Sequence, residues 1–127
     1  MDQDTYNTGR AIRAEVLGQS HVTAADASAF SKPMQDLATE YCWGAIWGRE
    51  GLSRQTRSML NLAMLSILDR PQELASHIKG ALDNGVSRAE VCEVLLQVAV
   101  YAGIPVGMNA FRVAEGTFAE LDASGQR

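Results

Sequence analysis

Apolar residues recur three and four positions apart along most of the chain, the spacing that gathers them on one face of an α-helix. No segment alternates apolar and polar residues over several positions, as a half-buried β-strand would. The pattern therefore predicts an all-α fold of about six helices. The expected helices are a short one around residues 12–17 and longer ones at residues 33–47, 54–68, 70–83, 88–102 and 105–121.

Polar residues, glycine and proline predict where these helices begin and end. Ser87 and Glu90 form a capping-box pattern, in which each side chain bonds the backbone N–H of the other residue. Asp69 and Gln72 offer the same arrangement next to Pro71, which lacks an N–H and therefore suits the first turn of a helix. Further expected boundaries are Ser53 and Pro105 at helix starts, and Asn84-Gly85 and Gly103 at helix ends.

Two of the expected helices are too apolar to lie on the surface of a small monomer. Their most apolar stretches are MLNLAMLSIL, residues 59–68, and VCEVLLQVAV, residues 91–100, which leave only a narrow polar face. A domain of this size has little interior in which to enclose both helices completely. We therefore expect subunits to associate through them; the alternative is that they are the central helices of a monomeric bundle.

Composition and charge narrow the classes of function. A chain of 127 residues with 46% apolar and 20% charged residues fits one globular domain, residues 1–127. The net charge of −4 and the scattered basic residues argue against a nucleic-acid partner. The acidic N-terminus does not fit a signal peptide, and residues 59–68 are too short to cross a bilayer. The lone cysteines Cys42 and Cys92 suit a reducing compartment, so we expect a cytoplasmic protein without membrane contact.

One pair of residues has the spacing of an acid–base site. Glu73 and His77 lie one helical turn apart, so the carboxylate could hold the imidazole in one tautomer and raise its pKa, which suits a general acid. The alternative is an exposed pair on a helix surface. His21, which we expect in a loop, is the other histidine of the chain, and no metal-binding spacing of histidines or cysteines is present, so we expect no metal.

A second candidate site is the segment EYCWGAIWGREGLSRQTRS, where aromatic residues and arginines lie together. An arginine beside aromatic walls can bind a carboxylate through two hydrogen bonds while water is kept out. The alternative is that the tryptophans only pack a helix end and the arginines face water, with Cys42 as a small core residue. The candidate substrate-binding residues are Tyr41, Trp43, Arg49 and Arg57.

Three longer segments carry a resemblance to a known family: WGAIWGREGLSRQTRS, ELASHIKGALDNGVSRAEVCEVLLQVAVYAGIP and AFRVAEGTF. Tyr6, Gly9, Arg13 and the segment VLGQSHV extend it to the N-terminus. On these residues the chain resembles the carboxymuconolactone decarboxylase family, in particular its 4-carboxymuconolactone decarboxylase branch within the alkylhydroperoxidase-D-like superfamily. The resemblance implies an all-α fold built around a helical hairpin, and trimers or hexamers with sites near subunit contacts.

The resemblance also argues against a thiol peroxidase. The two cysteines of the peroxidase members would fall at Arg70 and Glu73, and their glutamate would fall at Ser58. Other departures concern the expected pocket: the family's usual RPGL is REGL here, which introduces Glu50, and its frequent threonine is Asn61. The segment Pro105-Val106-Gly107 also differs from the family's pattern, so these positions leave the exact substrate open.

The resemblance implies a decarboxylation that needs no cofactor. Loss of CO2 from the γ-carbon of 4-carboxymuconolactone leaves a dienolate, which must be stabilised and then protonated to the enol-lactone of 3-oxoadipate, a step in aromatic catabolism. His77, oriented by Glu73, would deliver the proton. Roles in substrate binding would fall to Arg49 or Arg57 for a carboxylate, Trp43 for desolvation, and Tyr41 or Tyr101 for the oxyanion. Whether His21, Cys42 or Glu50 takes part is left open.

Two further hypotheses remain at this point. A related cofactor-free enzyme could act on another lactone or a keto acid by the same enolate logic, which the altered residues at positions 50, 61 and 105–107 favour. A non-catalytic helical oligomer could keep only the scaffold. In that case His77 should titrate near the reference value of about 6.5, because an exposed histidine has nothing to shift its pKa.

Overall fold

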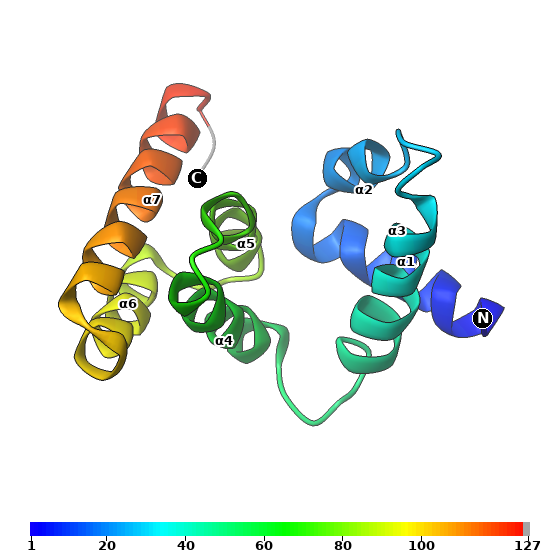
Figure 1. Cartoon of the computed structure of the whole chain (residues 1–127), viewed down its shortest axis with the longest axis horizontal. Helices are drawn as coiled ribbons and strands as arrows, with labels where there is room; N and C mark the ends of the chain where they lie inside the picture. The colour runs from blue at the N-terminus through cyan, green and yellow to red at the C-terminus, as the bar shows by residue number, and fades with distance from the viewer. Residues whose placement is uncertain (126–127) are drawn as a thin grey trace. The chain divides into compact units, whose positions relative to one another are not determined.

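The computed structural model describes residues 1–125, and the regular structure in this part of the chain is helical throughout (Figure 1). The predicted all-α fold is therefore confirmed. The elements are α1 (Gln3–Leu17), α2 (Gln19–Ala25), α3 (Lys32–Leu37), the π-helical segment η1 (Ala38–Ile46), α4 (Arg54–Ile67), α5 (Pro71–Asp83), α6 (Arg88–Ala102) and α7 (Ile104–Ala123).

Two compact units make up the chain, Met1–Arg54 and Gln55–Arg127. We refer to them as the first unit and the second unit. The expectation of a single domain stays a prediction. Within residues 1–125, none of the helices combines the length and the apolar character that crossing a membrane requires.

The N-terminal helices differ most from the sequence-based expectation. Where one short helix was expected, α1 begins already at Gln3, because the Asp2 side chain accepts a hydrogen bond from the backbone N–H of Asp4 and caps it. Gly18, at φ 100°, ends α1 and separates it from α2. The helix expected at residues 33–47 is observed as α3 leading directly into η1.

In the first unit, α1 packs very closely on η1 through two glycines. A Cβ atom added at Gly9 would collide with the backbone oxygen of Thr39, and one added at Gly44 would collide with the backbone oxygen of Thr5. Only residues without a side chain allow this approach. This close approach brings one turn of α1 against η1, and the core beside it consists of Ile12, Val16, Trp43 and Trp47.

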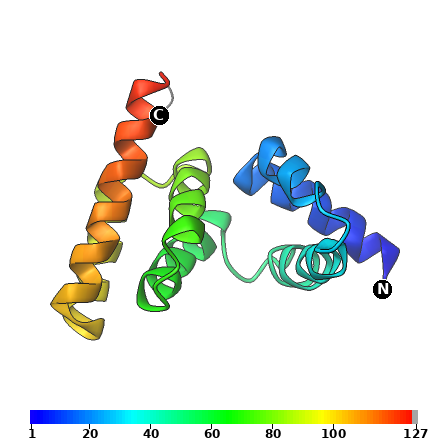
Figure 2. The ribbon, with the colours of Figure 1, turned by 45° about the horizontal axis from the view of Figure 1, so that its top comes forward.

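The second unit consists of α4–α7 around one apolar core. Helices α6 and α7 (yellow and orange) form a hairpin that turns at Gly103 and lies side by side in both views (Figures 1 and 2). Each of the four helices contributes to the core, and Leu62 and Ile78 are wholly inaccessible to solvent. Because α5 is anchored on its buried face by Leu74 and Ile78, the remaining faces of this helix have a defined orientation.

Most of the predicted helix ends of the second unit are confirmed. Ser87 and Glu90 form both hydrogen bonds of the capping box, at 2.9 and 3.0 Å. Gly85 and Gly103 have φ of 95° and 117°, which only glycine adopts without strain. The predicted cap by Asp69 is wrong. Asp69 itself has φ 56°, in the tight turn that ends α4, so the N-cap of α5 is Arg70, which makes no side-chain cap.

Candidate active site

Helix α5 carries the predicted acid–base pair. Glu73 is exposed in the first turn, next to the N-terminal end of the helix dipole, and His77 is half-buried one turn later. The Nδ1 atom of His77 is shielded from solvent. Within residues 1–125, no hydrogen bond or ion pair of the Glu73 carboxylate is formed. The pair thus has the predicted spacing, while orientation of His77 by Glu73 stays a prediction.

Two residues at the start of α4 add polar groups to the interior of the second unit. Arg57 is half-buried, and its Nε atom is shielded from solvent. Ser58 is 1% exposed, and within residues 1–125 its hydroxyl has no hydrogen-bond partner. A buried hydroxyl without a partner costs about 1–3 kcal/mol, so Ser58 is an unfavourable group in this apolar core.

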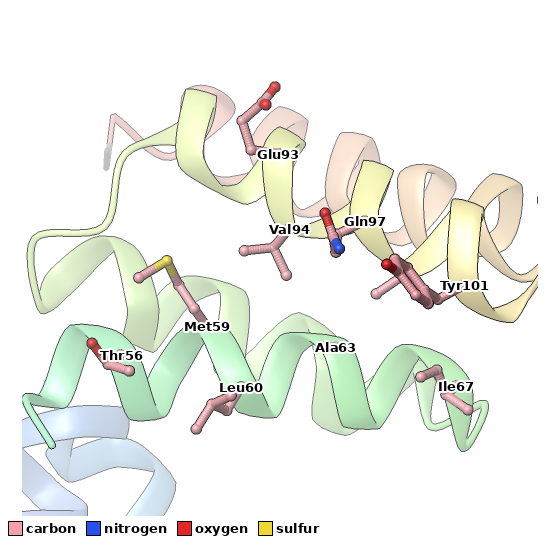
Figure 3. Close-up of a pocket in the computed structure, with 10 residues that line it drawn as sticks. Thr56, Met59, Leu60, Ala63, Ile67, Glu93, Val94, Gln97 and Tyr101 are labelled. Atoms are coloured by element: carbon pink, nitrogen blue, oxygen red, sulfur yellow. The ribbon is translucent and has the colours of Figure 1, made fainter. Parts of the chain in front are cut away.

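An apolar groove of about 530 Å³ lies between α4 and α6 (Figure 3). Met59 and Val94 extend into it from opposite helices, and Tyr101 lies near the C-terminal end of α6. Tyr101 is 82% exposed, so its hydroxyl is not held inside a closed pocket. The groove is lined by Thr56, Met59, Leu60, Ala63, Ile67, Glu93, Val94, Gln97, Val98 and Tyr101.

The remaining predicted substrate-binding residues belong to the first unit. Trp43 is buried and stacks on Trp47 with the ring centroids 4.8 Å apart, so it has the packing role that the sequence left open as the alternative. Tyr41 is exposed on η1, and Arg49 and Glu50 are exposed in the segment that follows η1. Contact of these residues with a substrate stays a prediction.

A polar cluster in the first unit was missed by the sequence reasoning. Arg13 is 8% exposed, and its guanidinium lies 3.3 Å from the hydroxyl of Thr39 and 3.3 Å from Nε2 of His21. His21 was expected in a loop; it lies in α2, because Gly18 ends α1 and a new helix starts at the next residue. The overlooked signal is the position of Arg13, which falls at a core spacing with Gly9, Ile12 and Val16.

The cluster has distinct electrostatics. Burial lowers the pKa of Arg13 and is the main reason that the pKa of His21 is also lowered, with the charge of Arg13 as a second cause. Burial raises the pKa of the Cys42 thiol, against the opposing effect of Arg13. Cys42 packs on the core of the first unit, in keeping with its expected role as a small core residue.

Metal-ligating side chains do not form a cluster anywhere in the described part of the chain. Among residues 1–125, no three His, Cys, Asp or Glu side chains lie close enough together to hold a metal ion.

Comparison with known proteins supplies an independent line of evidence. Residues 32–116 match the carboxymuconolactone decarboxylase family. The chain is 36% identical to 4-carboxymuconolactone decarboxylase of Acinetobacter baylyi over 122 residues, 94% of this chain and 91% of the relative. It is 37% identical to nitrosuccinic acid decarboxylase of Metarhizium robertsii over 123 residues, 95% of this chain and 86% of the relative. An uncharacterised 15.0 kDa protein of Paracoccus denitrificans is 30% identical over 86 residues, 65% of this chain and 63% of that protein.

Proposed function

Because the chain belongs to the carboxymuconolactone decarboxylase family and is a carboxy-lyase, we propose that its substrate is 4-carboxymuconolactone, which it converts to the enol-lactone of 3-oxoadipate in aromatic catabolism. The observation that carries the proposal is the 36% identity to a 4-carboxymuconolactone decarboxylase across 94% of this chain. The proposed reaction uses no cofactor and takes place in the cytoplasm.

The two named relatives support a common type of chemistry. In 4-carboxymuconolactone, loss of CO2 leaves a carbanion delocalised onto the carbonyl oxygen of the lactone. In nitrosuccinic acid, loss of the carboxylate next to the nitro group leaves a carbanion delocalised onto the nitro oxygens. Both reactions need a site that stabilises negative charge on oxygen and then protonates carbon, so protein groups alone can supply the catalysis.

In the proposed reaction, the bond between the γ-carbon and its carboxylate breaks and CO2 leaves. The electron pair is delocalised through the ring onto the carbonyl oxygen of the lactone. Protonated His77 then transfers a proton to the α-carbon and is reprotonated from solvent. Its position at the boundary between the core of the second unit and solvent supports this role, since the group must both meet substrate and exchange a proton with water.

The other predicted residues have supporting roles in the proposal. Glu73, one turn before His77, favours the charged imidazolium that acts as the acid. Arg57 is half-buried on α4, where a guanidinium is partly desolvated and binds a carboxylate more strongly than in water. Arg49 remains a second candidate for a substrate carboxylate, and Tyr41 or Tyr101 for the oxyanion.

A second candidate substrate is another acid whose decarboxylation leaves a delocalised anion. The chain is as similar to the nitrosuccinic acid decarboxylase as to the lactone decarboxylase, at 37% and 36% identity. Glu50 is exposed in the segment after η1, where a carboxylate replaces the proline that the resemblance leads us to expect. This added negative charge is the residue-level reason to test a second acid.

The experiment is a direct assay of both acids. Purified protein in excess chelator is mixed with 4-carboxymuconolactone or with nitrosuccinate, and substrate loss is measured together with CO2 release. Turnover of the lactone that survives chelation supports the proposal. Turnover of nitrosuccinate alone would replace the proposed substrate with the second one, and no CO2 release from either acid by folded protein would contradict both.

We also propose that the chain assembles into a homo-oligomer, a trimer or a hexamer, through the groove between α4 and α6. Leu60, Ile67 and Tyr101 line this groove and are 49%, 53% and 82% exposed. Apolar side chains that are exposed along one groove are typical of a contact surface. A second copy of this chain is the proposed occupant, because the family resemblance implies trimers or hexamers.

A further inference from the structure

Arg13 is a buried cation whose direct partners are both neutral. It extends from α1 to the hydroxyl of Thr39 at the start of η1, and to Nε2 of His21 in α2. The Thr39 hydroxyl donates to the backbone oxygen of Gln35 at 2.7 Å, so toward Arg13 it acts only as an acceptor. Neither partner therefore neutralises the charge of Arg13.

The contact with Arg13 defines the state of His21. A guanidinium has donors and no acceptor, so Nε2 of His21 must accept the hydrogen bond and the ring must carry its proton on Nδ1. Such a ring is neutral, in agreement with the lowered pKa of His21. His21 is therefore held as a neutral group beside a fixed positive charge.

One carboxylate that attracts Arg13 is already bound by another arginine. Asp26 attracts Arg13 at a distance, but both its carboxylate oxygens accept hydrogen bonds from Arg10, at 3.1 and 2.6 Å. Arg10 adds a second positive charge, which repels that of Arg13 and lowers the pKa of Arg13 further. Within residues 1–125, no carboxylate forms an ion pair with Arg13. Burying a cation without a paired anion is unfavourable, and proteins avoid it unless the site has a use for the charge.

Arg13 also retains unused donors. A guanidinium has five N–H groups, and the contacts with Thr39 and His21 use two of them. Its Nε is buried, with no hydrogen-bond partner within the described part of the chain. The half-exposed ring of His21 is the outermost group of the cluster, whereas Arg13 and Thr39 are buried, so a ligand would enter past His21.

We propose that Arg13, Thr39 and His21 form a binding site for the carboxylate of a small acid. A carboxylate supplies the negative charge that the cluster lacks, and its two oxygens match the planar donors of a guanidinium. Arg13 binds the anion, and Thr39 holds the guanidinium in place. The ring of His21 moves away from Nη2 of Arg13 when the ligand binds, so that Nη2 donates to the carboxylate, and the ring can itself donate a hydrogen bond from Nδ1.

The class of ligand rests on the proposed function, whereas the site rests on the geometry of the first unit. Each of the two acids considered above carries a second carboxylate besides the one lost as CO2. The ligand of the Arg13 site is thus a small molecule with two carboxylates, and a carboxylate that stays on the molecule is the one bound.

The test uses the two histidines of the chain as reporters. The full-length protein, labelled with ¹⁵N in its histidine rings, is titrated with succinate, a stable dicarboxylate, at constant ionic strength set with chloride. We expect a saturable shift of the His21 ring signals in wild type. The same shift produced by chloride alone, or no shift of His21 up to tens of millimolar succinate, would overturn the proposal.

Two variants separate the site from its scaffold. Arg13→Lys keeps the charge but loses the paired donors, and we expect the succinate dissociation constant to rise about tenfold or more. Thr39→Val removes the hydroxyl at nearly the same volume, and we expect a smaller rise. Unchanged affinity in folded Arg13→Lys would overturn the proposal, and circular dichroism of each variant establishes that it is folded.

The outcomes distinguish this proposal from the proposed function. Succinate binding at His21 in a protein that decarboxylates neither acid would support the site and contradict the proposed function. Turnover of either acid without a succinate-dependent shift of the His21 signals would support the proposed type of reaction and contradict the site. If the His21 signal instead changes on dilution of the protein and ignores succinate, the carboxylate comes from a second copy of the chain and the small-acid proposal is wrong.

Discussion

At the residue scale, His77 is the side chain on which the proposed chemistry depends. His77→Ala should lower kcat by roughly 10²-fold or more, because the proton transfer loses its general acid. Glu73→Gln should lower kcat less, because His77 itself is still present to transfer the proton. The assay is CO2 release at saturating substrate. Gln72→Ala, which truncates an exposed side chain on the same helix, is the control, and full activity of folded His77→Ala would remove His77 from the mechanism.

His21 gives a prediction about pH at the same scale. Its pKa is lowered by burial and by the charge of Arg13, so it should titrate below the ordinary value, and Arg13→Gln should raise its midpoint. The unfolded chain binds this proton more readily than the folded one. The contribution of His21 to stability is therefore present above about pH 6.5 and is lost as the pH falls below that value.

Histidine NMR titration of wild type and Arg13→Gln measures both midpoints. His77, which lies on α5 in the second unit, serves as the internal reference. A His21 midpoint at or above the ordinary value in wild type would contradict the contact between Arg13 and the neutral ring.

At the scale of helices, the contact of α1 with η1 should be intolerant of any side chain at Gly9. Gly9→Ala places a methyl group against the backbone oxygen of Thr39, and backbone cannot move aside cheaply. We expect a loss of about 1–3 kcal/mol in the free energy of unfolding, the usual range for overpacking. Urea unfolding measures it.

The matched control is Gly116→Ala on α7, where an added Cβ atom meets nothing within 4 Å. There we expect a gain of about 0.5–1 kcal/mol from the higher helix propensity of alanine. Equal effects of the two substitutions would contradict the close packing of α1 on η1.

Helix boundaries show what local sequence can predict. The caps at Ser87 and Gly103 depend on hydrogen bonds between residues three or four positions apart, and both were predicted. The cap predicted at Asp69 does not form, because that residue is in a left-handed conformation in the turn that ends α4. The same four-residue pattern thus forms a cap only where its first residue is not part of the turn that ends the preceding helix.

At the scale of the whole molecule, the proposed assembly predicts a defined response to charge in the groove. Leu60→Lys places an ammonium group among the apolar side chains that line it, and desolvating this charge in a contact is unfavourable. We expect a shift toward smaller species in size-exclusion chromatography with light scattering. Ala119→Lys, which adds the same charge at an exposed site on α7, is the control. A monomeric wild type would contradict the proposed assembly.

The sequence by itself determined the all-α class, most helix boundaries and the family, because these depend on residues a few positions apart and on motifs along the chain. Only the tertiary structure showed that Trp43 is a core residue and that Arg13 lies against Thr39 and His21. Arg13 and Thr39 are 26 positions apart. Their contact depends on the close approach of α1 to η1 at Gly9, a packing property that no local pattern of apolar and polar residues encodes.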